Sequence, residues 1–200
     1  RSTLFPYTTL FRSRDLSITM KYFTISEMLK SDTALKMRIW NGATKEYEDN
    51  MRALIENVLD PLREQYGHPI YVSSGYRCPT LNNAVNGALN SQHMRGEAAD
   101  IHARLTMPTP QTPIDYVESS ICGLDPQSLT PYDFTNENLK LAQMIAAAGN
   151  FDQMILEEVP ENSLEPRWIH VSYKRNGWNR KKILKKVSGK AGYIDITNLF

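Results

Sequence analysis

The segment Ser91-Gln92-His93-Met94-Arg95-Gly96-Glu97-Ala98-Ala99-Asp100 largely decides how this sequence is interpreted. It places a histidine and a carboxylate seven positions apart, with two alanines directly before the carboxylate. Another histidine, His170, lies in the apolar run Trp168-Ile169-His170-Val171-Ser172-Tyr173. Two neutral imidazoles and one carboxylate leave a coordination position open, as a catalytic zinc site requires. His93, Asp100 and His170 are therefore candidate Zn²⁺ ligands; the alternatives are a salt link on a surface loop and, for His170, a structural core histidine.

The same segment predicts its local fold. Seven positions exceed one helical turn, so the chain must turn back between the histidine and the carboxylate. Gly96 is expected to permit that turn. Residues 98–102 are then predicted to form a strand. We expect it to lie beside the strand of residues 167–173 in one antiparallel sheet, with His93 approaching from the preceding loop.

Helices are predicted on both sides of this segment. Thr24 and Glu27 have the spacing of a capping box, which indicates a short helix over 25–31. Apolar residues at helical spacing predict a longer helix from Thr44, which Pro61 should kink or split and Gly67 should end. Another helix is expected at 135–148, capped by Thr135.

The other elements complete an α+β fold, in which helices pack on a small antiparallel sheet. Strands are predicted at 70–74 and 151–157, the second forming a hairpin with 167–173. Residues 79–90 are expected to form a loop and a short helix over the site. The basic stretch 181–186 is interpreted as a solvated helix face.

Length and composition describe one ordinary globular domain. The chain has 200 residues, 41% hydrophobic and 22% charged, and a net charge of +1. This balance argues against a dedicated nucleic-acid binder. No apolar run approaches the roughly 20 residues that span a membrane. We expect a monomer.

The start of the sequence is unusual. Residues 1–13 resemble a translated sequencing adapter, and the first methionine is Met20. We therefore expect residues 1–19 to be an artefactual or disordered leader, with no signal peptide visible, and residues 20–200 to form a single domain. Residues 104–134 include a proline-rich stretch and are interpreted as a surface insertion that could serve as a lid or a substrate-binding loop.

Three blocks of this sequence resemble the zinc D-Ala-D-Ala carboxypeptidase family, which shares its metal site with hedgehog-like and lysostaphin-like peptidases. They are Ser73-Ser74-Gly75-Tyr76-Arg77-Cys78-Pro79, the Ser91–Asp100 segment and the Trp168–Tyr173 run. The resemblance covers roughly residues 44–186, and within the family the sequence resembles the phage-like branch. The resemblance implies a hedgehog/D-Ala-D-Ala peptidase-like fold, and it implies that His93, Asp100 and His170 bind Zn²⁺.

The resemblance also suggests roles for the surrounding polar residues. The family's arginine falls on Arg77, which could bind a substrate carboxylate or polarise the scissile carbonyl, against the alternative of a structural ion pair. Ser91 could orient the first ligand or a substrate group. His102 and His68 are expected to be structural or exposed.

A hydrolase of this kind needs a base for the attacking water. Many family members place a glutamate three residues before the last histidine, but this position is Arg167 here. We favour Glu157, because Phe-Asp-Gln-x-Ile-x-Glu precedes the His-Val-Ser strand in phage-like relatives. Glu158 and Glu165 are the alternatives, and Glu157 could also be an exposed carboxylate at a strand end.

The resemblance thus implies a zinc metallopeptidase that hydrolyses peptidoglycan stem peptides in the bacterial cell wall, in the manner of a D-Ala-D-Ala carboxypeptidase. One alternative is a phage-type endolysin, an endopeptidase that cuts within the stem or cross-bridge and stays in the cytoplasm until release. Another is a non-catalytic zinc-containing module that binds the wall.

Overall fold

The computed structural model describes residues 20–103 and 131–200, and its architecture is α+β, as the sequence predicts. The helical elements, which include one π-helical turn (η1) and two 3₁₀ turns (η2 and η3), are α1 (Ile25–Leu29), α2 (Asp32–Met37), α3 (Lys45–Leu54), η1 (Ile55–Leu59), α4 (Asp60–Tyr66), α5 (Pro79–Ala84), η2 (Gln92–Arg95), α7 (Pro131–Ala148) and η3 (Thr197–Leu199). The strands are β1 (Ile70–Ser74), β2 (Ala98–Ala103), β3 (Gln153–Val159), β4 (Trp168–Ser172), β5 (Lys182–Val187) and β6 (Ile194–Asp195). The predicted leader and residues 104–130 of the predicted insertion lie outside the described residues.

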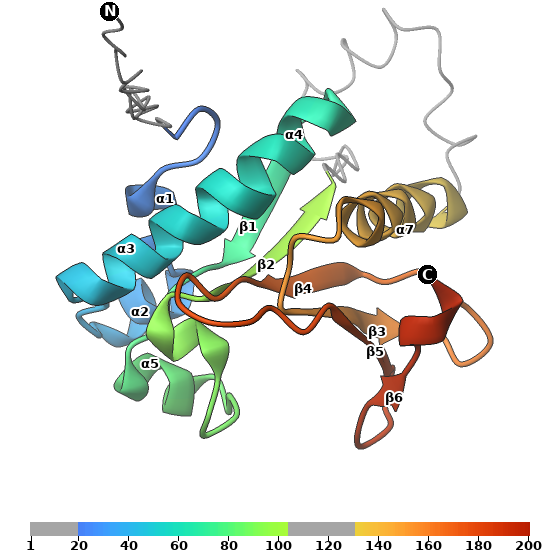
Figure 1. Cartoon of the computed structure of the whole chain (residues 1–200). Helices are drawn as coiled ribbons and strands as arrows, with labels where there is room; N and C mark the ends of the chain where they lie inside the picture. The colour runs from blue at the N-terminus through green and yellow to red at the C-terminus, as the bar shows by residue number, and fades with distance from the viewer. Residues whose placement is uncertain (1–19, 104–130) are drawn as a thin grey trace, which may run out of the picture.

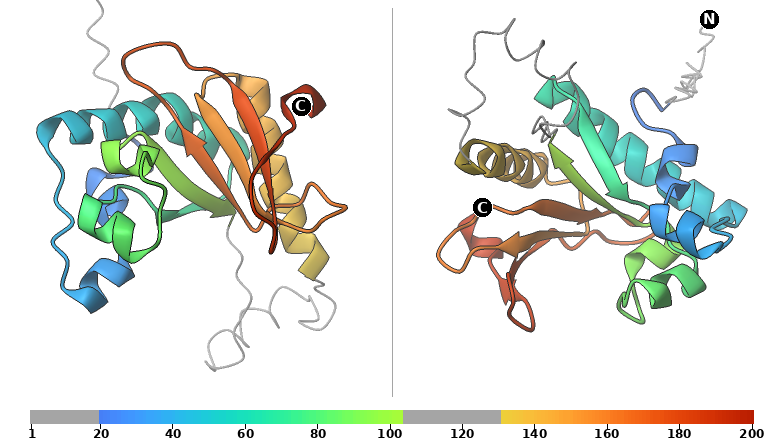
Figure 2. Two further views of the ribbon diagram at one scale, coloured as in Figure 1. Left: turned by 90° about the horizontal axis from the view of Figure 1, so that it is seen from below. Right: turned by 180° about the vertical axis from the view of Figure 1, so that it is seen from behind.

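One six-stranded sheet, in the order β1-β2-β4-β3-β5-β6, organises the molecule. The rod formed by α3, η1 and α4 lies on one side of it together with α7, whereas α5 and η2 lie on the other side (Figures 1 and 2). Apolar residues of the rod, such as Met51 and Leu54, share a buried core with Ala99 and Ile101 of β2 and with Leu141 of α7. The opposite face of β2 therefore remains available for polar residues.

The long helix has the interruption that Pro61 predicts. It takes the form of the π-helical turn η1 directly before the proline, in which the Asp60 N–H bonds to the Ile55 carbonyl. Proline has no N–H to donate to the carbonyl four residues earlier, which belongs to Asn57. The side-chain amide of Asn150 donates to that carbonyl at 2.9 Å instead.

The predicted end signals agree with the structure. The hydroxyl groups of Thr24 and Thr44 cap α1 and α3, and Gly67 ends α4 in the left-handed conformation with φ 78°. The start of α7 differs from the prediction: the helix begins at Pro131, not after Thr135. Proline is favoured in the first turn of a helix, where its missing N–H has no intrahelical partner to lose.

The sheet is mixed, because β3 and β5 are parallel while the other pairs are antiparallel. The parallel strand is the basic stretch 181–186, so its interpretation as a helix face is wrong. Ile183 and Leu184 are buried in the sheet. Lys185 is buried too, and its ammonium group donates to the carbonyls of Glu161 and Ser163 at 2.9 and 2.6 Å. The lysines suggested a solvated face, but a short apolar run between them is also compatible with a strand.

Within the described residues, none of the helices combines the length and the apolar character that crossing a bilayer requires.

Candidate metal centre

Asp100 and His170 lie opposite each other on the neighbouring antiparallel strands β2 and β4, as the sequence predicts. The adjacent pair, Ala99 and Val171, is fully buried in the core beneath the helices. Successive side chains of a strand point to opposite faces. Burial of the apolar pair therefore directs Asp100 and His170 to the other face of the sheet.

His93 reaches the same point from the 3₁₀ turn η2. This turn ends at Gly96, which has φ 68° and confirms the predicted reversal of the chain. A Cβ atom at this position would lie 2.4 Å from the carbonyl oxygen of Tyr47, so a side chain does not fit there. The Nδ1 atom of His93 lies 2.6 Å from the carbonyl oxygen of Gly75. Because a carbonyl can only accept, Nδ1 donates and Nε2 presents a lone pair to the centre.

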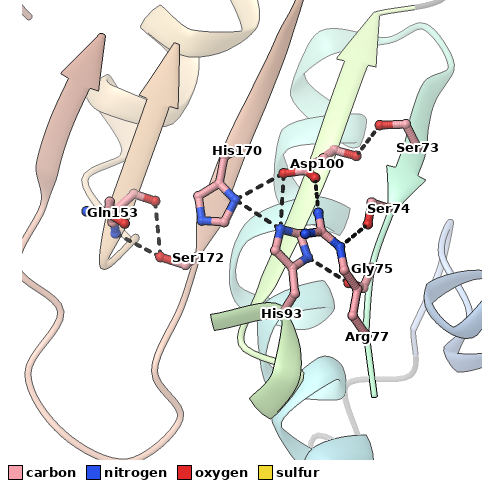
Figure 3. A network of polar contacts seen from close by, with 9 residues as sticks. All are labelled: Ser73, Ser74, Gly75, Arg77, His93, Asp100, Gln153, His170 and Ser172. Carbon is pink, nitrogen blue, oxygen red and sulfur yellow. Dashed lines mark hydrogen bonds and ion pairs between the residues drawn. The ribbon is translucent and has the colours of Figure 1, made fainter. Parts of the chain in front are cut away.

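Three candidate ligand atoms converge at this centre (Figure 3). The Nε2 atom of His93 lies 3.2 Å from Oδ1 of Asp100 and 3.1 Å from Nδ1 of His170, and the latter two atoms are 3.0 Å apart. A tetrahedral zinc ion with bonds of about 2.0–2.1 Å separates its ligand atoms by roughly 3.3 Å. All three residues are at least nine-tenths buried. The donor set therefore fits a divalent metal, and metal binding itself stays a prediction.

Asp100 has the protonation state that a metal ligand needs, because a carboxyl group binds a metal ion in its deprotonated form. Burial by itself would raise the pKa of this carboxyl group, but the charges and hydrogen bonds of His93 and His170 hold the pKa well below its ordinary value. Asp100 is therefore ionised at neutral pH.

Arg77 donates a hydrogen bond to the second carboxylate oxygen of Asp100. The register of β1 against β2 shifts between Val72 and Ser74, which inserts one extra residue into β1 as a bulge. The hydroxyl of Ser74 then accepts a hydrogen bond from Nε of Arg77 at 2.9 Å, while Nη2 of Arg77 donates to Oδ2 of Asp100 at 2.7 Å. Oδ1 remains directed at the two histidines (Figure 3). The structure thus shows the ion pair that was one alternative for Arg77, and its contact with substrate stays a prediction.

A cleft of about 760 Å³ opens at the centre. The three candidate ligands and the residues first favoured for substrate binding and catalysis line it: Arg77, Ser91, His93, Asp100, Glu157 and His170. On one side it is bordered by the loop that follows α5, and on the other by Leu184 of β5 and by Tyr193, which precedes β6. Substrate could reach the three candidate ligands through this cleft.

Glu157 is better placed as a base than either alternative. It lies two residues beyond Ile155, the partner of His170 on β3, and therefore shares the face of the sheet that carries the centre. Burial raises the pKa of Glu157, and the charge of Asp100 adds to this shift, while that of His170 opposes it. Glu158 has φ 52° at an irregularity of β3, and neither Glu158 nor Glu165 is among the residues that line the cleft. The catalytic role of Glu157 stays a prediction.

No role was predicted for Asp152, whose partners Gln92, Lys174 and Arg180 line the cleft, or for Tyr193, which lines it directly. Asp152 is fully buried and accepts hydrogen bonds from Gln92 at 3.0 Å and from Arg180 at 2.6 Å, while Lys174 lies 3.2 Å from it. An acidic residue at the start of an apolar strand was the available signal. Tyr193 lines the cleft from a segment without any motif, so nothing in the sequence pointed to it.

The other two described histidines stand apart from the centre. The ring of His102 stacks on Tyr71 with 5.7 Å between centroids, and the ring of His68 packs edge-on against Tyr66 at 5.5 Å. Neither belongs to the group of His93, Asp100 and His170 that could hold a metal. Both are therefore suitable controls for that group.

Comparison with known proteins agrees with this geometry. The model of the Peptidase M15 family matches residues 21–109. The matched part contains Arg77, His93 and Asp100, while His170 and Glu157 lie beyond it. A search of the curated proteins finds no match.

Proposed function

Because the chain belongs to the peptidase M15 family by its match over residues 21–109, we propose that it is a zinc-dependent peptidase acting on the stem peptides of peptidoglycan. The observation that carries this proposal is the convergence of His93, Asp100 and His170, with 3.0–3.2 Å between their candidate ligand atoms. Two imidazoles and one monodentate carboxylate would hold Zn²⁺ and leave one position for water. When bound, the ion would lower the pKa of a water molecule to about 7 and so supply a nucleophile at neutral pH.

Glu157 would transfer the proton of the attacking water. Glu157 lies on the same face of the sheet as the ligands and lines the same cleft. Its carboxylate would accept the proton of the attacking water and return it to the leaving amine. A raised pKa suits both halves of this task, because the group must gain and lose a proton near neutral pH.

Arg77 and Ser91 would position the substrate. The guanidinium of Arg77 has five N–H groups, of which Ser74 and Asp100 each take one, so donors remain for the scissile carbonyl oxygen. Ser91 lines the cleft directly before η2, where its hydroxyl could bind a backbone group of the peptide.

Hydrolysis of purified muropeptides, followed by mass spectrometry, tests the proposal. We expect cleavage by the zinc-loaded protein, loss of cleavage with a chelator, and recovery when zinc is added. His93→Ala should be inactive, whereas His102→Ala, which changes a histidine outside the centre, should retain activity. Cleavage that survives His93→Ala would exclude the mechanism. Binding of muropeptides without turnover would instead favour a non-catalytic wall-binding module.

A further inference from the structure

Two basic residues that line the cleft, Lys174 and Arg180, share a single carboxylate, that of Asp152. We call these two residues the cation pair. The ammonium group of Lys174 lies 3.2 Å from Oδ1 of Asp152, and Arg180 donates to Oδ1 from Nε at 2.9 Å and to Oδ2 from Nη2 at 2.6 Å. The other cations that line the cleft, Arg77 and Arg95, each have a carboxylate of their own, at 2.7 and 2.9 Å. Among the described side chains of the cleft, an excess of positive charge therefore arises at the cation pair.

This positive charge lies to one side of the metal centre. Asp152, which holds the cation pair, directly precedes β3, whose first residue Gln153 is opposite the last residue of β4, Ser172. His170 lies two residues back along β4, and Glu157 lies four residues further along β3, roughly 13 Å from Gln153. Figure 3 shows Gln153 and Ser172 next to His170. The centre is therefore flanked by the cation pair at one end of these strands and by the carboxyl group of Glu157 at the other.

The protein orders the cation pair by contacts of its own. The side chain of Asp152 has no exposed surface, and the backbone N–H of Arg180 also donates to its Oδ1 at 3.1 Å. The side chain of Asn179 closes the connection between β4 and β5, because it accepts from the N–H of Lys174 at 2.8 Å and donates to the carbonyl of the same residue at 3.2 Å. Groups that are ordered in advance lose less conformational entropy when they bind a ligand.

The cation pair and Gln92 keep hydrogen-bond donors for a ligand. Arg180 uses two of its five N–H groups on Asp152, Lys174 uses one of three, and Gln92 donates one of its two amide hydrogens to Oδ2 of Asp152 at 3.0 Å. All three residues line the cleft, and 29% of the Lys174 side chain and 41% of the Arg180 side chain are exposed. Cationic donors of this kind form strong, charge-assisted hydrogen bonds with carboxylates.

We propose that Lys174, Arg180 and Gln92 form a subsite that binds a carboxylate of the peptide substrate, at a distance from the reacting atoms. This inference rests on the proposed hydrolytic function and adds a determinant of specificity to it. The excess positive charge favours an anionic group at this end of the cleft, whereas the carboxylate of Glu157 disfavours one at the other end. The subsite would therefore also fix the direction in which the peptide lies across the centre. The bound carboxylate belongs either to an acidic residue of the peptide or to its C-terminus, and the experiments below distinguish these two sources.

The first test compares three versions of one stem peptide with the zinc-loaded wild-type protein. One version is unmodified, the next carries a C-terminal amide, and in the last the carboxylate of the acidic residue is converted to an amide. We expect one of the two amides to raise KM about tenfold while kcat stays within about twofold, because the lost contact is remote from the scissile bond. The amide that has this effect identifies the source of the carboxylate. Unchanged KM values for both amides would overturn the subsite.

The second test removes the excess charge from the protein. Lys174→Met leaves Asp152 paired with Arg180, so the buried carboxylate keeps a counter-charge and the protein should stay folded. We expect KM for the unmodified peptide to rise about tenfold, and the amide that weakened binding to wild type to have no further effect. Lys182→Met is the control, because this lysine pairs with Asp195 at 3.5 Å and does not line the cleft, and it should distinguish acid from amide as wild type does. Full discrimination by Lys174→Met would contradict the inference.

Peptide binding separates failure of this inference from failure of the proposed function. The same three peptides are titrated calorimetrically into the Glu157→Gln protein with and without Lys174→Met. Binding that amidation weakens about tenfold, but only in the protein that retains Lys174, would support the subsite even for a protein that proved to lack hydrolytic activity. Equal Kd values for the acid and both amides would overturn the subsite, even for a protein that proved to be an active peptidase.

Discussion

At the scale of single residues, the two carboxylate oxygens of Asp100 have different partners. One faces the two histidines of the candidate metal centre and the other binds Arg77. Oδ1 lies 3.0–3.2 Å from the two histidine nitrogens, whereas Oδ2 accepts from Arg77 at 2.7 Å. A carboxylate held in this way presents one oxygen in a fixed direction. Replacing a residue that orients a metal ligand typically costs about 10–100-fold in metal affinity or activity.

Arg77→Lys tests this orientation while it keeps the positive charge. A lysine cannot donate to Ser74 and Asp100 from one planar group, so the carboxylate should become less ordered. We expect zinc affinity, measured by competition with a chelator, to fall about tenfold. Arg63→Lys, at an arginine of α4, should leave the affinity unchanged. An unaltered affinity in Arg77→Lys would show that this arginine does not orient the ligand.

Glu157→Gln tests the assignment of the base. The amide is nearly the same size but cannot accept the proton of water, so kcat should fall about 10²–10⁴-fold. Zinc content should remain unchanged, because Glu157 is not one of the converging ligands. Glu158→Gln changes the neighbouring glutamate, which does not line the cleft, and should retain wild-type kcat. The reverse result would assign the base to Glu158.

The sequence was informative about residues whose spacing is set by a motif. It predicted which three side chains meet, because Asp100 and His170 lie on strands whose faces follow from alternation and Gly96 lets the chain turn back so that His93 reaches the same face. It could not predict that Arg77 pairs with Asp100, since this depends on a bulge in β1. Tyr193 was missed for a similar reason, because only the turn before β6 brings it to the cleft.

At the scale of elements, Asn138 joins three parts of the fold. Its side chain is fully buried on α7, accepts from the N–H of Ala103 at 2.8 Å, and donates to the carbonyls of Pro166 and Arg167 at 3.1 and 2.8 Å. One amide thus holds the end of β2, the start of β4 and helix α7 together. It stabilises the two strands that carry Asp100 and His170.

Asn138→Leu should therefore destabilise the protein although it adds an apolar side chain to the core. Three backbone groups, of which those of Ala103 and Pro166 are buried, would lose their partner, and we expect the free energy of unfolding to fall by about 2–4 kcal/mol. Urea denaturation followed by circular dichroism measures this change. Gln143→Leu on the exposed side of α7 should change the stability by less than about 0.5 kcal/mol. Equal effects of both substitutions would contradict the account of α7.

Element boundaries were predictable where a local signal sets them. Thr24, Thr44 and Gly67 begin or end helices as expected, because capping depends on adjacent backbone groups. The type of element at 182–187 was not predictable, since its pairing partner β3 lies about 30 positions earlier in the sequence.

At the scale of the whole molecule, Asp152 links two segments of the chain that border the cleft. It connects η2, through Gln92, with Lys174 and Arg180 on the connection between β4 and β5. Burial raises the pKa of Asp152, but the hydrogen bonds of Arg180 and Lys174 outweigh this effect and lower it to about 2. In the unfolded chain the pKa returns to about 3.9.

This difference predicts how stability depends on pH. A depressed folded-state pKa contributes stability that is fully present above about pH 4 and is lost as pH falls toward 2. The difference in the free energy of unfolding between wild type and Asp152→Asn should therefore be constant from pH 5 to 7 and shrink below pH 4. Urea denaturation at a series of pH values measures it. A difference that grew as pH fell would contradict the assignment.

The zinc content of the purified protein tests the central claim most directly. After zinc loading and exhaustive dialysis, elemental analysis should find about one zinc ion per chain in wild type and in His102→Ala. It should find none above background in His93→Ala and in His170→Ala, with both variants folded by circular dichroism. Wild-type protein that retained no zinc, or alanine variants that retained it fully, would contradict the assignment of His93, Asp100 and His170 as a metal centre.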